Sequence, residues 1–142
     1  MRHQAALQQA LATVPLFAAC SKRDLQIVAR HMQVVAVPGG TTLMREGDQG
    51  DAFYVVLDGR AVVEAKGKPM GVLRAGDHVG ELALLDPAPR NATVTAATDM
   101  TVGVVDARTF AAIVRDVPAL SGKLLAALAR RLRDRDREAV SR

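Results

Sequence analysis

Residues 80–94 read GELALLDPAPRNATV, and this stretch interrupts a long series of short strand-like segments. Its ELALL portion is too short for a free-standing helix but suits about a turn and a half of helix inside a folded domain. Gly80 stands just before this turn, where a residue without a side chain allows a close approach of the backbone. The stretch therefore predicts a loop built around one short helix and inserted between β-strands.

The same stretch carries the groups of an anion site. Unpaired N–H groups at the start of a helix attract negative charge. Arg90 follows on a loop stiffened by Pro87 and Pro89, and its planar guanidinium suits bidentate binding of phosphate oxygens. Glu81, at the start of the short helix, can accept a hydrogen bond from a hydroxyl group. One acceptor beside one phosphate-binding arginine is typical of a sugar-phosphate pocket.

Residues 33–106 follow the pattern of an all-β structure. Short runs rich in β-branched residues alternate with turns that contain Gly, Pro and Asp. These runs are VVAVP, TLMRE, AFYVVLD, AVVEAK, MGVLRA, ATVTAA and MTVGVVD. Such spacing favours a sandwich or barrel over alternating strands and helices. We predict a mainly β fold with flanking helices, in which a jelly-roll-like β-roll has about eight strands.

Both ends of the chain have helical periodicity instead. Residues 3–12 predict a short amphipathic helix, and Ser21, followed three residues later by an acid, predicts a capping box for a second helix. Asp106 is a candidate N-cap for a helix over residues 107–116, and Pro118 suits the first turn of a longer helix. The apolar face of this last helix consists of Leu120, Leu124, Leu128 and Leu132.

Length and composition narrow the class of protein. A chain of 142 residues is long enough for one domain with its own core. No apolar run approaches the roughly 20 residues of a membrane helix, and the N-terminus lacks the unbroken apolar region of a signal peptide. A single cysteine, Cys20, excludes an internal disulfide framework. We therefore expect a reduced, cytoplasmic protein with no membrane partner.

The net charge of +4 does not indicate a nucleic-acid partner. Residues 128–142 hold six arginines interspersed with three acidic residues, and the rest of the chain is nearly balanced. This pattern is more typical of a solvated helix face than of a phosphate-contacting surface. Three Phe and one Tyr are too few for a base-stacking surface. We expect no direct nucleic-acid binding by this chain.

The stretch at 80–94 resembles the phosphate-binding cassette of cyclic-nucleotide-binding domains. These occur in catabolite-activator (CRP/FNR) proteins, in regulatory subunits of cAMP-dependent kinase and in cyclic-nucleotide-gated channels. Three further segments match the family pattern in order and spacing: VPLF at 14–17, PGGTTLMREGDQGDAFYVVLDG at 38–59 and Gly-Asp at 76–77. Without this resemblance, Arg90 would be an ordinary surface arginine and Glu81 an ordinary acid at a helix start.

The resemblance implies a role for each matching position. Arg90 would bind the exocyclic oxygens of the cyclic phosphate, and Glu81 the ribose 2′-hydroxyl. The other implied contacts of the cassette are Gly80, Leu82, Ala83, Asn91 and Ala92. The strand residues implied beside the base and sugar are Val63, Met70 and Leu73. The implied contacts of a closing C-terminal lid are Leu132, Arg135 and Asp136.

Asn91 departs from the commonest family pattern, in which Ser, Thr or Ala follows the arginine. A hydroxyl at this position can favour cGMP in the family, and an amide offers both a donor and an acceptor. We expect cAMP as the ligand, with cGMP as the alternative. Because the chain has no nucleophile elbow, GK[ST] phosphate loop or clustered histidines, we expect neither catalysis nor a metal.

Three other features have ordinary structural interpretations. Residues 47–51 form a turn, because Asp48 and Asp51 supply fewer oxygen ligands than a Ca²⁺ loop needs. Cys20 adjoins an apolar segment and acts as a small hydrophobic residue. The three histidines are scattered, which indicates structural or solvated roles.

We predict one domain over residues 1–142, with N-terminal helices at 1–32, the β-roll at 33–106, and hinge and lid helices at 107–142. It would sense a cyclic nucleotide and move its C-terminal helix to regulate a protein effector or an attached output domain. A CRP/FNR regulator would continue into a helix-turn-helix domain, which these residues do not contain. The alternatives are a regulatory fragment of such a transcription factor, and a degenerate scaffold that binds no nucleotide. The leucine stripe is compatible with a homodimer through the C-terminal helix.

Overall fold

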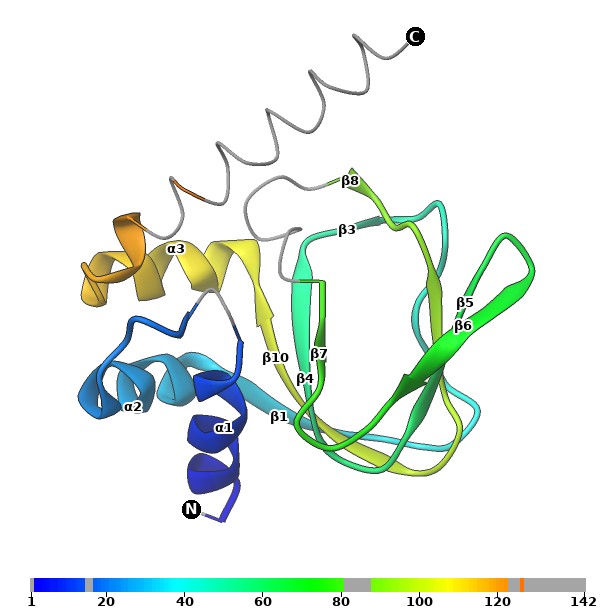
Figure 1. The fold of residues 1–142 in the computed structure, drawn as a ribbon, viewed down its shortest axis with the longest axis horizontal. Helices are drawn as coiled ribbons and strands as arrows, with labels where there is room; N and C mark the ends of the chain where they lie inside the picture. Colours follow the sequence, from blue (N-terminus) through cyan, green and yellow to red (C-terminus); the bar gives the residue numbers. More distant parts are fainter. Residues whose placement is uncertain (1, 15–16, 81–87, 123–125, 127–142) are drawn as a thin grey trace, which may run out of the picture.

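The computed structural model describes residues 2–14, 17–80, 88–122 and 126, and within them the chain forms a β-roll with helices packed on one side (Figure 1). The helices are α1 (Arg2–Ala12), α2 (Lys22–His31) and α3 (Ala107–Asp116). The strands are β1 (Gln33–Val37), β2 (Thr42–Met44), β3 (Gln49–Gly50), β4 (Ala52–Asp58), β5 (Ala61–Ala65), β6 (Lys68–Leu73), β7 (His78–Val79), β8 (Ala88–Pro89), β9 (Thr93–Ala96) and β10 (Met100–Asp106).

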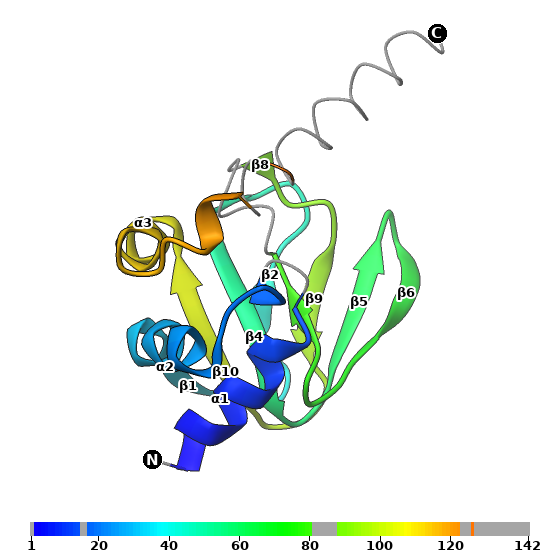
Figure 2. The ribbon, with the colours of Figure 1, turned by 60° about the vertical axis from the view of Figure 1, so that its left-hand side comes forward.

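The strands form two four-stranded sheets and one small pair, all antiparallel. One sheet has the order β1-β10-β4-β7 and the other β2-β9-β5-β6, while β3 pairs with β8. Figure 2 shows α1, α2 and α3 together on the side of the β1-β10-β4-β7 sheet, with the β5–β6 hairpin on the opposite side of the molecule. The predicted mainly β roll with flanking helices is confirmed. The β3–β8 pair adds two short strands in segments that we predicted as a turn and a loop.

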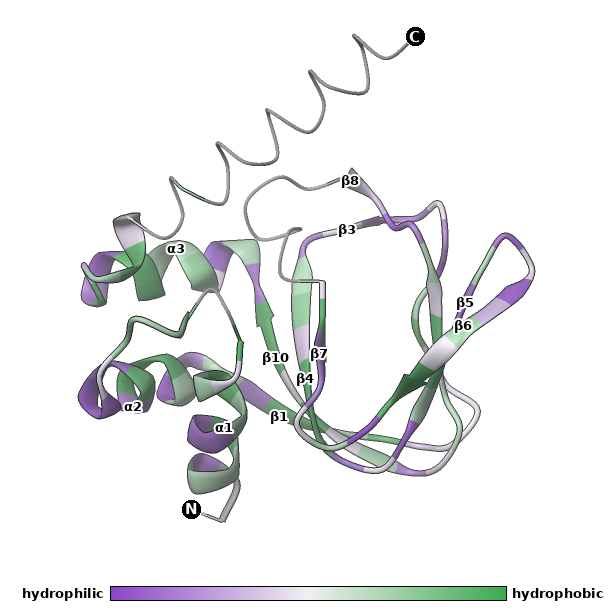
Figure 3. Ribbon diagram, viewed as in Figure 1, coloured by the Kyte–Doolittle hydropathy of each residue, from purple (hydrophilic) through white to green (hydrophobic). Residues whose placement is uncertain are grey.

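Two hydrophobic cores share the strands β4 and β10. Neighbouring residues of a strand point to opposite faces, so both faces of these strands can be buried. On β4, Phe53 and Val55 pack with the helices, whereas Val56 packs inside the roll. Figure 3 shows the hydrophobic colour along β4 and β10 and hydrophilic residues at the tip of the β5–β6 hairpin. This double burial makes the two strands the wall between the helical layer and the roll.

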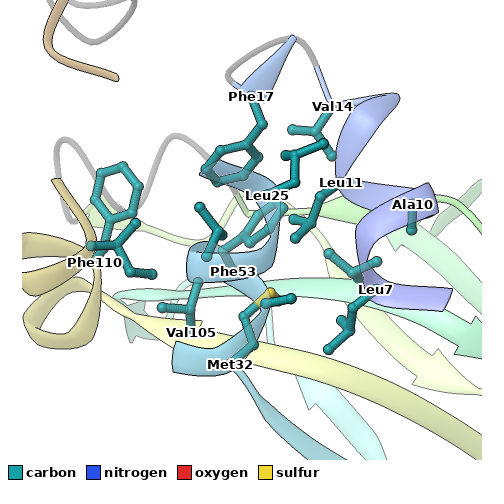
Figure 4. Packing of buried hydrophobic residues seen from close by; sticks show 14 of the residues in the cluster. Leu7, Ala10, Leu11, Val14, Phe17, Leu25, Met32, Phe53, Val105 and Phe110 are labelled. Carbon is teal, nitrogen blue, oxygen red and sulfur yellow. The ribbon is translucent and has the colours of Figure 1, made fainter. Parts of the chain in front are cut away.

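The helical core is centred on two aromatic side chains (Figure 4). Phe17 and Phe53 are almost fully buried, and their ring centroids lie 6.0 Å apart at a tilted angle of 59°, within the usual range for an aromatic pair. The other buried members of this core are Leu7, Ala10, Leu11, Val14, Leu25, Val28, Ala29, Met32, Val55, Val105, Phe110, Ile113, Val117 and Leu120. Side chains from the N-terminal helices, from β4 and β10 and from α3 thus pack together in one core.

The helix boundaries agree with the local signals in the sequence. The Ser21 side chain accepts a hydrogen bond from the Asp24 N–H, and the Asp24 carboxylate accepts one from the Ser21 N–H, both at 3.1 Å. Asp106 accepts a hydrogen bond of 2.7 Å from the Thr109 N–H at the start of α3. After Pro118, residues 120–122 are helical, as is residue 126, and the rest of the predicted last helix lies outside the described residues. The predicted short helix at 81–85 lies outside the described residues.

Substitution of Asp106 tests the cap of α3. We expect Asp106→Ala to lower the free energy of unfolding by about 1 kcal/mol, because the Thr109 N–H loses its acceptor. Asp106→Asn keeps an oxygen acceptor and should lose less. Urea denaturation at pH 7 measures both changes. Equal stability of the wild type and Asp106→Ala would contradict a stabilising cap.

The charge of this cap predicts a pH dependence. The hydrogen bond from the Thr109 backbone N–H holds the pKa of Asp106 below its usual value. A folded-state pKa below the unfolded one means stabilisation that is complete above the unfolded pKa, near 4, and is lost as the pH falls through the folded pKa. We expect the stability difference between the wild type and Asp106→Asn to shrink below about pH 4. Urea denaturation from pH 7 to pH 2.5 measures it, and a difference that grows on acidification would contradict this assignment.

Candidate functional site

The backbone around Arg90 is held by a turn far away in the sequence. β8 ends at Pro89, and its partner β3 brings residues 47–50 alongside (Figure 1). The Arg90 N–H donates a hydrogen bond of 2.8 Å to the Asp48 carbonyl, and the Gly47 N–H donates one of 2.8 Å to the Arg90 carbonyl. Because both backbone groups of Arg90 are bonded to the same turn, the direction in which its side chain leaves the backbone is defined.

The guanidinium of Arg90 is tied to the edge of the helical core. Its Nη2 donates a hydrogen bond of 2.8 Å to the Ala52 carbonyl, and the side chain is half-buried. Ala52 begins β4, and the next residue, Phe53, is almost fully buried. The ring centroids of Phe53 and His78 lie 5.9 Å apart. Arginine has five N–H donors, and this bond uses one. The Ala52 carbonyl thus fixes one corner of the guanidinium.

Gly80 lies against the other side of this arrangement. It follows β7, whose residue Val79 pairs with Tyr54 of β4. Gly80 has a φ of +89°, which glycine adopts at far lower cost than other residues. A Cβ at Gly80 would lie 2.7 Å from the Ala52 carbonyl oxygen and 2.9 Å from Nη1 of Arg90. The predicted close approach of the backbone at Gly80 is therefore an approach to Arg90 and Ala52.

Among the described residues, no carboxylate lies within salt-bridge distance of Arg90. Among these residues, a histidine and a carboxylate approach each other elsewhere: Nε2 of His31 lies 3.3 Å from Oδ2 of Asp116, between the ends of α2 and α3. A half-buried cation is stabilised by an anion that brings its own negative charge and hydrogen-bond acceptors. The arrangement around Arg90 is chemically suited to a phosphate group.

The structure brings together some of the predicted pocket residues. Val63 of β5 and Leu73 of β6 pack against the core of the roll. Met70 does not join them: its side chain is 65% exposed. The register of β5 with β6 shifts after Val63, so Met70 falls at an irregularity between paired residues. Such a bulge re-aims the side chain.

The remaining predicted contacts divide into two groups. Asn91 is exposed and Ala92 half-buried, directly after Arg90. The others lie outside the described residues: Glu81, Leu82, Ala83, Leu132, Arg135 and Asp136.

Other candidate chemistry is sparse in the described part of the chain. Within it, no group of three or more His, Cys, Asp or Glu side chains is placed to hold a metal ion. Burial raises the pKa of the Cys20 thiol, and the nearby charge of Asp24 raises it further. No helix among these residues has the length and apolar composition needed to cross a membrane.

One part of the candidate site was not predicted from the sequence. Residues 47–51, Gly-Asp-Gln-Gly-Asp, were interpreted as an ordinary turn, yet residues of this turn hold the backbone of Arg90. The available signal was a pair of glycines three residues apart, directly before a long strand. Ala52 contributes through its carbonyl group, and a backbone carbonyl leaves no mark on the sequence.

The match to known proteins settles the family. A family model described as cyclic nucleotide-binding domain matches residues 34–116. The chain belongs to this family. It is thus a cyclic nucleotide-binding domain, and the resemblance inferred from the cassette is confirmed.

Several relatives of this cyclic nucleotide-binding domain are regulatory proteins. The cAMP-dependent protein kinase regulatory subunit of Schizosaccharomyces pombe is 37% identical over 110 residues, which are 77% of this chain and 27% of that protein. The N-terminal domain of a transcriptional regulator from Streptomyces coelicolor A3(2) has a TM-score of 0.78 at 33% identity, covering 88% of this chain and 93% of that one. The regulatory domain of Toxoplasma gondii PKA, solved with cAMP, has a TM-score of 0.70 at 35% identity, covering 81% and 46%. The chain thus spans a minor part of its yeast relative.

A pair of glycine substitutions tests the packing at Gly80. Gly40 has nearly the same φ, +91°, but a Cβ there would meet nothing within 4 Å. We expect Gly40→Ala to cost about 1 kcal/mol of stability from backbone strain alone. Gly80→Ala should cost at least about 1 kcal/mol more, because its Cβ would also overlap the Ala52 carbonyl. Urea denaturation of both variants measures the difference, and equal losses would contradict the close approach.

Proposed function

We propose that this domain senses cAMP, in preference to cGMP, through a phosphate contact made by Arg90. The observation that supports the proposal is the half-buried guanidinium, held by the Ala52 carbonyl and by a backbone pair with residues 47–48. A cyclic phosphate carries one negative charge and two exocyclic oxygens, which suit the remaining donors of an arginine. The ligand would be bound and released without chemical change.

The sugar contact would come from the residue after Gly80. Glu81 directly follows Gly80 in the chain, and Gly80 lies beside Nη1 of Arg90. In the proposed complex the Glu81 carboxylate accepts a hydrogen bond from the ribose 2′-hydroxyl, while the backbone of Gly80, Leu82 and Ala83 contacts the sugar phosphate. A carboxylate accepts hydrogen bonds and cannot donate them at neutral pH, which suits a hydroxyl and repels a phosphate oxygen.

The base would lie between the roll and the C-terminal segment. Val63 and Leu73 offer apolar surface beside the roll core. Met70 remains a proposed base contact. Because its side chain is exposed, it is accessible to a ligand or to the lid. Leu132, Arg135 and Asp136 complete the proposed lid. Asn91, exposed directly after Arg90, is the residue that would distinguish the purines.

The proposed output is a movement of the C-terminal helices. α3 ends at Asp116, the backbone leaves the helical conformation at Val117, and helix resumes at Leu120 after Pro118. This break would act as the hinge. Ligand can shift the arrangement of the helices only if it binds one arrangement more tightly than the other. The movement would act, in the cytoplasm, on a protein effector, on an attached output domain or on a homodimer formed through the last helix.

A second candidate function has one specific observation in its favour. The Streptomyces coelicolor neighbour is the N-terminal domain of a transcriptional regulator, and the alignment covers nearly all of it. In that case, the 1–142 unit would be the sensor part of a DNA-binding protein. The ligand site proposed above is the same for both candidates.

Calorimetric titration with cAMP and cGMP tests the ligand and its contact. We expect saturable binding of both, with cAMP tighter, and a loss of at least about 2 kcal/mol of binding free energy in Arg90→Ala. The matched control is Arg60→Ala, which removes the same charge from an exposed position beyond the far end of β4. Folded wild-type protein that binds neither nucleotide would contradict the sensor and leave the scaffold alternative.

Hydrogen exchange tests the proposed movement. We expect saturating cAMP to increase the protection of amides within residues 107–137, because the lid and hinge become ordered over the ligand. Arg90→Ala at the same cAMP concentration is the control and should show the exchange pattern of the free protein. Ligand-bound wild type with unchanged exchange in this segment would contradict a moving helix while leaving the binding site intact.

A further inference from the structure

Gly50 of β3 lies directly under the guanidinium of Arg90. A Cβ at this position would overlap Nε of Arg90 and would lie 2.7 Å from both Cζ and Nη2. These atoms belong to the part of Arg90 that donates to the Ala52 carbonyl. Any side chain at position 50 therefore requires the guanidinium to leave its place.

The reason for glycine at this position is space rather than backbone conformation. Gly47 and Gly80 have φ values of +88° and +89°, whereas the φ of Gly50 is not positive. Its backbone is one that alanine adopts without strain, as expected for a strand residue. The three atoms nearest to a Cβ at Gly50 all belong to Arg90, so a substitution there acts first on the contact with Arg90.

The same turn holds both the backbone and the side chain of Arg90. Asp48 and Gly47 bond to its backbone, Gly50 leaves room for its guanidinium, and the Ala52 carbonyl accepts from Nη2. An arginine side chain has several rotatable bonds, so ordering it only on ligand binding would reduce affinity. Residues 47–52 provide contacts that hold the side chain through the protein's own groups.

We propose that Gly50 is a positioning residue for Arg90: by lacking a side chain, it lets the guanidinium lie against β3, in the place from which it contacts the phosphate. The effect on nucleotide affinity rests on the function proposed above. The effect on Arg90 itself does not, because the contact belongs to the protein alone. Gly50 touches no nucleotide and acts through Arg90.

A double-mutant cycle between Gly50 and Arg90 tests this role. Wild type, Gly50→Ala, Arg90→Ala and the double variant are compared by thermal unfolding without ligand. We expect Gly50→Ala to lower Tm by about 5 °C, and we expect most of this loss to vanish when Arg90 is already alanine, because the methyl group then has room. If Gly50→Ala alone fails to fold, folding of the double variant is the expected rescue. An equal loss in both backgrounds would overturn the proposal.

Calorimetry with cAMP provides the second readout. We expect Gly50→Ala to weaken cAMP binding at least tenfold, as expected when a charged contact is displaced, and to have no further effect in the Arg90→Ala background. The matched control is Gly67→Ala at the tip of the β5–β6 hairpin, where φ is +75° and a Cβ would meet nothing within 4 Å. That variant should lose stability additively with Arg90→Ala and keep wild-type affinity.

The two readouts separate this proposal from the function on which it rests. Wild-type affinity in Gly50→Ala would overturn the positioning role while leaving the nucleotide site intact. If the wild type binds neither cAMP nor cGMP, the proposed function fails, and the ligand-free stability cycle still decides whether Gly50 positions Arg90.

Discussion

The hydrogen bond from Arg90 to the Ala52 carbonyl is the contact on which the candidate site depends. It links a charged side chain on a loop to the first residue of β4. That strand is anchored at its next position by Phe53, which is packed against Phe17 in the helical core. A binding group attached to a rigid strand loses less conformational freedom when a ligand arrives than one on a free loop. The free energy of core packing therefore also maintains the geometry of the site.

The same end of β4 adjoins the start of α3. In the β4–β10 ladder, Ala52 lies opposite Asp106, and Asp106 is the N-cap of α3. Ala52, which accepts from the guanidinium, is thus paired directly with Asp106, which starts α3. At its other end, α3 approaches α2, where Oδ2 of Asp116 lies 3.3 Å from Nε2 of His31. Both ends of α3 are held by polar contacts, and its buried face packs on the sheet through Phe110 and Ile113.

The roll and the helical layer lie on opposite faces of β4 and β10 and contribute different residues. The roll supplies the turns that surround Arg90 and the apolar residues Val63 and Leu73, whereas the helices cover the opposite face of β4 and β10. Because these two strands are buried on both faces, they are held rigidly between the two layers. A ligand at the roll and a rearrangement of the helices would therefore be separated by the thickness of one sheet. Relatives that share this fold include a kinase regulatory subunit and the N-terminal domain of a transcriptional regulator.

The class of fold and the helix caps could be predicted from the sequence, and the sequence also singled out Arg90 as the candidate phosphate contact. Caps and turns are decided by residues within four positions of each other, as at Ser21 with Asp24 and at Asp106 with Thr109, so local sequence is sufficient. Arg90 could be proposed as a phosphate contact because the stretch at 80–94 is continuous in the chain.

The surroundings of Arg90 and the directions of the strand side chains could not be predicted from the sequence, because they depend on contacts between distant segments. Ala52 is 38 residues away and acts through a carbonyl that every residue type possesses, and Gly50 matters for the side chain that it lacks. The exposure of Met70 follows from a register shift between β5 and β6, which alternation along one strand does not reveal. Pairing between distant strands sets these contacts, and that pairing is specified by the packing of the whole domain rather than by any short segment.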